Sequence, residues 1–250
     1  MQEHEPWLTA LFNDHLAGLG NTILSTVLPI FGRPYTAQAR PWETFIVMQI
    51  LVAIIMILTF AILRPKLSMD KPGKMQHIFE AAYNFLHHQA HDNIGHGSSR
   101  FVPYVGSMFF FVLFCNLLGI IPTLESPTMF PYVPAGLAIA SFLYYNFMGA
   151  KIQGIGKYLL HFCGPVWWLA PLMLPIEIIS HLARPASLTI RLFANMFAGE
   201  QVTLVFLGLT FIGFPVIFMG LHVFVSFLQA YIFALMTMIY LGGAVAQNHE

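Results

Sequence analysis

Residues 187–209 read SLTIRLFANMFAGEQVTLVFLGL, an apolar stretch of helix length that contains a single arginine, Arg191. A guanidinium group keeps its positive charge at every working pH. Placing that charge at the centre of a bilayer costs about 2.5 to 3.5 kcal/mol on insertion scales, so intramembrane arginines have a partner or a task. The stretch therefore predicts a membrane helix that carries a functional polar site.

The whole chain has the composition of an integral membrane protein. Of its 250 residues, 57% are hydrophobic and 9% are charged, which is far from the average of soluble domains. Asp, Glu, Lys and Arg are absent from residues 101–124, 126–150 and 201–249. Each run exceeds the roughly 20 residues that cross a bilayer. The formal net charge is +0, so no basic field indicates a nucleic-acid partner.

Five membrane crossings follow from the apolar runs and from the prolines that interrupt them. They belong to one all-α polytopic membrane domain spanning residues 1–250, with an interfacial helix and a long tilted C-terminal hairpin. The expected segments are an N-terminal outer arm (1–43), a first span (44–63), a cytoplasmic loop with a surface helix (64–100), second and third spans (101–150) and a tilted ion-path hairpin (165–245).

The basic residues orient these crossings. Cytoplasmic loops of membrane proteins carry an excess of Lys and Arg. The N-terminus is therefore expected outside and the C-terminus in the cytoplasm. This arrangement leaves two basic residues outside, Arg33 and Arg40, and seven inside: Arg64, Lys66, Lys71, Lys74, Arg100, Lys151 and Lys157.

Two further patterns concern the shape of the domain. Residues 75–92 have one apolar side and a charged or histidine-rich opposite side, as expected for a helix on the inner membrane surface. The last two helices are expected at 171–209, with a bend near Pro185, and at 215–245. Thirty helical residues measure about 45 Å against a hydrocarbon core of about 30 Å, so both must tilt or protrude. The apolar side of the surface helix comprises Ile78, Ala81, Ala82, Phe85, Leu86 and Gln89.

Helical angles place the polar residues of the last two helices on defined faces. One face of the helix expected at 171–209 holds Glu177, Arg184, Ser187, Arg191 and Asn195. Glu200 falls on the opposite side from Arg191, about 13 Å further along, while His222 and Gln229 share a face of the final helix about 10 Å apart. Polar groups thus lead toward Arg191 from two ends.

This arrangement predicts two aqueous half-paths separated by a fixed cation that blocks direct proton passage. A mobile partner carboxylate would ionise when it faces Arg191 and become neutral when it faces lipid, where desolvation favours the acid. Under a membrane potential, worth about 2.3 kcal/mol per charge per 100 mV, carriage between the half-paths becomes directional.

At these residues the chain resembles the a subunit of F-type ATP synthases, the proton-channel stator subunit of the membrane sector. Four stretches carry the resemblance, and it extends over nearly the whole chain beyond the arm. They are KPGKMQHIFE at 71–80, NLLGIIP at 116–122, SLTIRLFANMFAGE at 187–200 and HVFVSFLQAYIFALMTMIYL at 222–241.

The resemblance implies a role for each matched polar residue. Arg191 would be the essential arginine that faces the carboxylate of the c-ring. Asn195, Glu200, His222 and Gln229 match the half-channel open to the outside, and Glu177 and Ser180 match the cytoplasmic side. The expected function is to couple proton flow to ring rotation and ATP synthesis, without a catalytic site in this chain.

The resemblance also implies the surroundings of the protein. Its partners would be the c-subunit ring, the peripheral-stalk b subunits, the rest of the ATP synthase complex and the lipid bilayer of a bacterial inner (plasma) membrane.

No Gly-rich phosphate loop is present, so no direct nucleotide partner is expected. No cofactor or metal is expected either. Cys115 and Cys163 lie in apolar segments without framework spacing, and the cluster His87, His88, His91, Asp92 and His96 is interpreted as a solvated helix face.

Other interpretations remain open at this point. Arg191 could pair with Glu177 or Glu200 simply to hold a bundle together. The chain could be a stand-alone ion channel or secondary transporter, although no internal repeat typical of secondary carriers is evident. A non-conducting scaffold would leave the intramembrane Arg, Glu and His without a function.

Overall fold

The computed structural model describes residues 6–27, 29, 40–68, 73–95, 97–121, 124–154, 156, 170–209 and 213–245. Every regular element in these ranges is helical, which confirms the all-α prediction for the described part of the chain. The expected start of the hairpin at 165, Arg33, Lys71, Lys157, Cys163 and His96 lie outside the described residues. The helices are α1 (Trp7–Val27), α2 (Thr44–Leu63), α3 (Lys74–Ile94), α4 (Val102–Leu118), α5 (Tyr132–Gln153), α7 (Ala170–Leu209) and α8 (Gly213–Val245).

Three of these helices are long and apolar enough to cross a membrane, namely α2, α5 and the Val216–Val245 part of α8. Helix α4 is apolar but shorter. Helix α7, which carries four charged residues, is not among the three. The chain therefore has the helices of a polytopic membrane protein, and the count of five crossings stays a prediction.

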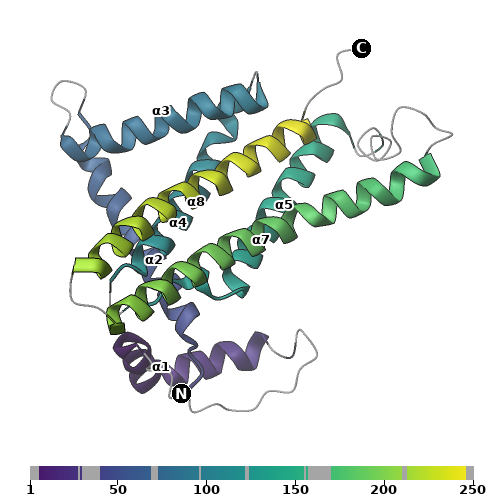
Figure 1. Ribbon diagram of the computed structural model, residues 1–250. Coiled ribbons are helices and arrows are strands. Elements are labelled where there is room, and N and C mark those ends of the chain that lie inside the picture. Colours follow the sequence, from purple (N-terminus) through teal and green to yellow (C-terminus); the bar gives the residue numbers. More distant parts are fainter. Residues whose placement is uncertain are drawn as a thin grey trace.

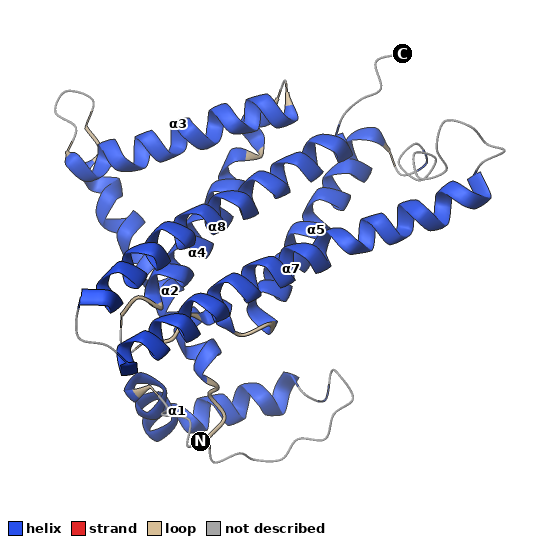
Figure 2. Cartoon of the chain, in the orientation of Figure 1, coloured by secondary structure: helices blue, strands red, loops and turns tan. Residues whose placement is uncertain are grey.

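The two longest helices, α7 and α8, lie side by side, with α2, α4 and α5 behind them and α1 and α3 at opposite ends (Figure 1). Helix α8 packs on α4, α5 and α7, and short loops complete the described chain (Figure 2). The core between these helices is apolar and includes Val105, Val112, Leu192 and Phe233, all of them fully buried. This close packing holds α7 and α8 in a fixed position relative to each other.

Helix α7 runs without interruption through both of its prolines, Pro175 and Pro185. A proline removes one backbone hydrogen bond, and neighbouring helices and hydroxyl side chains make this tolerable in membranes. Here Thr189 Oγ1 donates to the Pro185 carbonyl at 2.8 Å. With 40 residues, the helix is about 60 Å long, twice the thickness of the hydrocarbon core, so it must tilt in a bilayer or protrude from it.

Helix α1 was not predicted, because residues 1–43 were interpreted only as an arm. Its periodicity is hard to recognise, since the polar residues Thr9 and Asn13 are buried while Trp7 is exposed. Asn13 exchanges two hydrogen bonds with the backbone of Trp42, at 3.0 and 3.1 Å. A Cβ on Gly20 would come within 2.7 Å of the Pro41 ring. These contacts hold α1 against the start of α2.

The predicted apolar side of α3 does not form its contact with the rest of the chain. The buried residues of α3 are Gln76, Leu86 and Ala90, whereas Ile78 is 63% exposed and Phe85 42% exposed. Only Leu86 belongs to both sets. Helix α3 therefore buries one edge against α4 and α8 and leaves most of its apolar side uncovered, and its place on the membrane surface stays a prediction.

Candidate ion-path site

A hydrogen bond between α7 and α8 joins two of the predicted site residues. Asn195 Nδ2 donates to Gln229 Oε1 at 2.9 Å. Gln229 is buried and Asn195 reaches the surface of the chain. Because α7 and α8 are antiparallel neighbours, residues 34 positions apart meet at the same level.

Arg191 lies one helical turn before Asn195, about 6 Å along the axis, and is half-buried. Among the described residues, none forms a hydrogen bond or an ion pair with its guanidinium. The next residue, Leu192, faces the core. Arg191 therefore lies at the edge between the packed face of α7 and the face that is exposed in this chain. The interpretation that Arg191 pairs with Glu177 or Glu200 is not supported.

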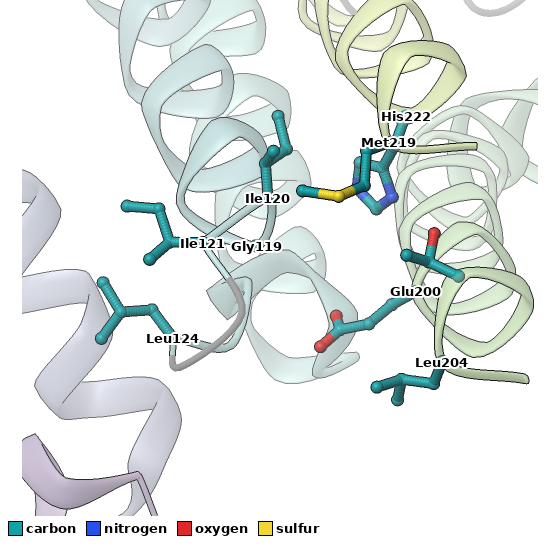
Figure 3. A pocket seen from close by; sticks show the side chains of 9 residues that line it. Gly119, Ile120, Ile121, Leu124, Glu200, Leu204, Met219 and His222 are labelled. Carbon is teal, nitrogen blue, oxygen red and sulfur yellow. The ribbon is translucent and has the colours of Figure 1, made fainter. Parts of the chain in front are cut away.

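Glu200 and His222 line a cavity of about 90 Å³. Figure 3 shows both side chains pointing into the space between the α7–α8 pair and the end of α4. The opposite wall is apolar and includes Ile120 and Ile121. The remaining lining residues are Gly119, Leu124, Thr203, Leu204 and Met219. A carboxyl and an imidazole thus border the same cavity.

A second cavity, of about 260 Å³, lies on the other side of His222 and is lined by Asn195. His222 and Thr203 border both cavities. A buried water needs about 10–15 Å³ of accessible volume and two to four polar partners, so both cavities have room for water. The imidazole of His222 therefore stands at the junction between the Glu200 cavity and the Asn195 cavity.

Several polar atoms along this route are buried and have no hydrogen-bond partner among the described residues. They are Glu200 Oε2, His222 Nε2, Ser226 Oγ and Gln229 Nε2. Three of the four follow α8 at positions 222, 226 and 229, which share one helix face. A buried polar atom without a partner costs several kcal/mol in a membrane. The row of atoms is therefore suited to a file of water molecules.

Gly199 allows the close approach of His222 to α7. A Cβ added at residue 199 would lie 3.1 Å from Nδ1 and 3.3 Å from Cε1 of the imidazole. Gly199, Thr203 and Ser226 were not predicted as site residues. The one signal for Gly199 in the sequence is that a glycine inside a long helix is unusual. Thr203 and Ser226 have no feature that distinguishes them from ordinary helix residues.

A buried polar network fixes the loop that walls the Glu200 cavity. Asn116 Nδ2 donates to the Ser226 carbonyl at 3.3 Å, and Thr128 Oγ1 donates to Asn116 Oδ1 at 2.6 Å. Ser126 Oγ lies 2.7 Å from Thr128 Oγ1 and donates to the Cys115 carbonyl at 3.0 Å. Asn116, Ser126 and Thr128 are fully buried. The network ties the segment after α4 to the middle of α8.

The other end of α7 carries the remaining predicted site residues. Glu177 Oε1 and Arg184 Nη2 are 3.8 Å apart, and the Arg184 guanidinium lies over the Tyr240 ring at 5.2 Å. Ser180 is exposed on the same helix. Arg184 had no predicted role, and it is the partner of Glu177. This group lies apart from the Glu200–His222 cavity, because Glu177 and Arg184 come 23 and 16 residues before Glu200 on the same helix.

No group of three or more His, Cys, Asp or Glu side chains in the described residues could hold a metal ion. On α3, His88 and His91 each approach Asp92, at 3.6 and 4.0 Å, on an exposed surface. Cys115 is a free, buried cysteine.

Comparison with known proteins identifies the family. A family model described as ATP synthase A chain matches residues 46–242. A protein of Solibacter usitatus named ATP synthase subunit a is 59% identical over 239 residues, which cover 96% of this chain and 100% of that protein. A protein of the same name from Koribacter versatilis is 45% identical over 247 residues, 99% of each chain. The chain therefore belongs to the ATP synthase subunit a family, whose members are part of the ATP synthase membrane sector.

Proposed function

We propose that this chain is the proton-translocating stator subunit of a bacterial ATP synthase, with two half-channels that meet a ring of c subunits at Arg191. The observation that carries the proposal is the row of unpartnered buried polar atoms from Glu200 to Gln229, flanked by two cavities and ending one turn from Arg191. The family membership supports it.

The outer half-channel would run through the Glu200 and Asn195 cavities. Protons would enter at Glu200, pass to His222, whose imidazole can accept at one nitrogen and release at the other, and continue along Ser226 to Gln229 and Asn195. The two steps along α8, from His222 to Ser226 and from Ser226 to Gln229, each span about one helical turn. Water in the two cavities would bridge the gaps that side chains cannot close.

Arg191 would act as the electrostatic barrier between the half-channels and as the counter-charge of the ring carboxylate. Residues on its open side are small and exposed, namely Ser187, Ala194 and Ala198. Small residues let a neighbouring membrane helix approach closely. A carboxylate brought within about 4 to 6 Å of the guanidinium would ionise, and a free proton would be repelled.

The inner half-channel would begin at Glu177 and Ser180. Glu177 is only half-buried and pairs with Arg184, so its carboxylate can exchange protons with water. It lies 14 residues before Arg191, about 21 Å along α7, on the opposite side of the barrier from Glu200. The two carboxyl groups would therefore serve opposite sides of the membrane.

The remaining features of the proposal concern topology and partners. The chain would cross the membrane five times, with α1 outside, α3 on the cytoplasmic surface, and α7 and α8 strongly tilted beside the ring. It would contact the c-ring and the peripheral-stalk b subunits and carry no catalytic site. A stand-alone channel or transporter would be expected to enclose its arginine, whereas Arg191 stands at the edge of the chain.

Proton-driven ATP synthesis by the whole complex in lipid vesicles tests this function. Glu200→Ala and His222→Ala should each lower the synthesis rate at least about tenfold, since positioned proton-transfer groups contribute about 10²–10⁴-fold. The matched control is Glu80→Ala, which removes an exposed carboxylate from α3. Synthesis at the wild-type rate in both cavity variants, with normal assembly, would remove this route from the mechanism.

A further inference from the structure

A buried histidine on the inner half of α7, His181, has no place in the ion path described so far. It lies one turn after Glu177 and is 9% exposed. Its Nε2 lies 3.0 Å from Asn146 Oδ1 on α5. The rings of Phe142 and Tyr145 meet the imidazole edge to face, with centroids 5.6 and 5.4 Å away. These contacts hold the ring in one orientation.

The hydrogen bond to Asn146 decides which ring nitrogen exchanges a proton. Asn146 Nδ2 donates to the Phe142 carbonyl at 2.7 Å, so the amide oxygen is the atom turned toward His181. A carbonyl oxygen only accepts, and Nε2 must therefore carry hydrogen in both the neutral and the protonated ring. Any proton that His181 gains or loses is gained or lost at Nδ1.

Among the described residues, ionisable groups near His181 come from α7 itself, from α5 and from α8. Glu177 and Arg184 lie one turn before and one turn after it on α7 and pair with each other at 3.8 Å. Tyr145 comes from α5, and Tyr240 of α8 packs on Tyr145 and beneath Arg184. The Glu177 carboxylate favours an imidazolium and the Arg184 guanidinium opposes it. The two charges therefore act on the imidazole in opposite directions.

We propose that His181 is a proton-binding residue of the inner half-path and relays protons between the side of α7 that faces the c-ring and Glu177. This proposal rests on the proposed function. In the direction of ATP synthesis, a proton released from the carboxylate of a c subunit forms an N–H bond at Nδ1 of His181, which becomes an imidazolium. That N–H bond then breaks, the proton passes to the Glu177 carboxylate or to water on the inner side, and the imidazole of His181 is neutral again.

The alternative is a purely structural histidine that ties α7 to α5, and two substitutions separate the roles. His181→Gln keeps an N–H group that can donate to Asn146 Oδ1, but its amide does not titrate. His181→Leu loses both the donor and the titrating ring. The matched control is His88→Gln on α3, where the histidine is exposed and remote from the path.

The test measures ATP synthesis by the whole complex in vesicles while the pH on the side of the catalytic sector is varied between about 5.5 and 8, the range in which histidine titrates. The quantity of interest is the rate of each variant divided by that of the wild type, which cancels the pH response of the catalytic sector. For His181→Gln we expect a ratio of about one-tenth or less that changes across this range. For His88→Gln we expect a ratio near one throughout.

Each other outcome contradicts the relay. A ratio near one at every pH for His181→Gln, with only His181→Leu impaired, would make the residue structural. Failure of both His181→Gln and His181→Asn to assemble would lead to the same conclusion. Arg191→Ala in the same vesicles separates this inference from the proposed function, because wild-type synthesis by Arg191→Ala would overturn both, whereas its loss beside a normal His181→Gln would overturn the relay alone.

Discussion

Asn195 donates a 2.9 Å hydrogen bond to Gln229 and thereby joins the two longest helices one turn from Arg191. The acceptor is buried, and its own Nε2 has no partner among the described residues. The bond therefore does two things at once. It sets the level at which α7 and α8 meet, and it leaves a polar amide group facing the route toward the arginine.

Asn195 and Gln229 should consequently behave as a coupled pair. Asn195→Leu and Gln229→Leu should each slow ATP synthesis, and the double substitution should cost less than the sum of the two. Hydrogen bonds between membrane helices contribute about 0.6 kcal/mol on average, so the coupling energy should be of that order. A double-mutant cycle on the synthesis rate measures it, and strict additivity would show that the bond does not matter for transport.

A side chain at residue 199 should displace His222. In Gly199→Ala the new Cβ would meet Nδ1 of His222 at 3.1 Å, which is tighter than nine in ten such contacts, so the imidazole must shift by a few tenths of an ångström. We expect ATP synthesis to fall severalfold while the complex still assembles.

Gly208→Ala is the control for this substitution, because a Cβ at residue 208 of the same helix would meet nothing within 4 Å. Both alanine substitutions raise helix propensity equally. Equal synthesis rates in the two variants would mean that the contact between residue 199 and His222 has no role.

Thr128→Val should destabilise the segment after α4, which borders the Glu200 cavity. The substitution keeps the shape of the side chain but leaves Asn116 Oδ1, which is fully buried, without its 2.6 Å donor. An unsatisfied buried acceptor costs about 1–3 kcal/mol. The thermal midpoint of the purified complex should drop, and Thr26→Val on the exposed side of α1 should leave it unchanged. An unaltered midpoint in Thr128→Val would contradict the stabilising role of the network.

The helices themselves could be predicted from the sequence because simple signals mark their ends. Helix α2 occupies the predicted residues 44–63, and α7 begins at Ala170 against a predicted 171. Long charge-free runs, prolines and basic residues at the membrane edge define such boundaries. Helix α1 lacks these signals, since it buries Thr9 and Asn13 and exposes Trp7.

The composition of the site was predictable only in part. Helical angles separate Glu200 from Arg191 and place His222 and Gln229 on one face, and both features agree with the structure. The cavities depend on where α7, α8 and the segment after α4 meet, which no periodicity reveals. Gly199, Thr203 and Ser226 matter only through these contacts, and His181 is distinguished by its aromatic neighbours on α5.

The central claim is that Arg191 separates two half-channels, and the most direct test compares wild-type, Arg191→Ala and Arg191→Lys complexes at matched assembly in vesicles. Proton-driven ATP synthesis and passive proton leak are measured on the same preparations, with Arg100→Ala as the control for loss of an arginine. We expect Arg191→Ala to abolish synthesis and to raise the leak through the subunit, and Arg191→Lys to keep the leak low because a cation remains. Coupled synthesis by Arg191→Ala near the wild-type rate would contradict the claim.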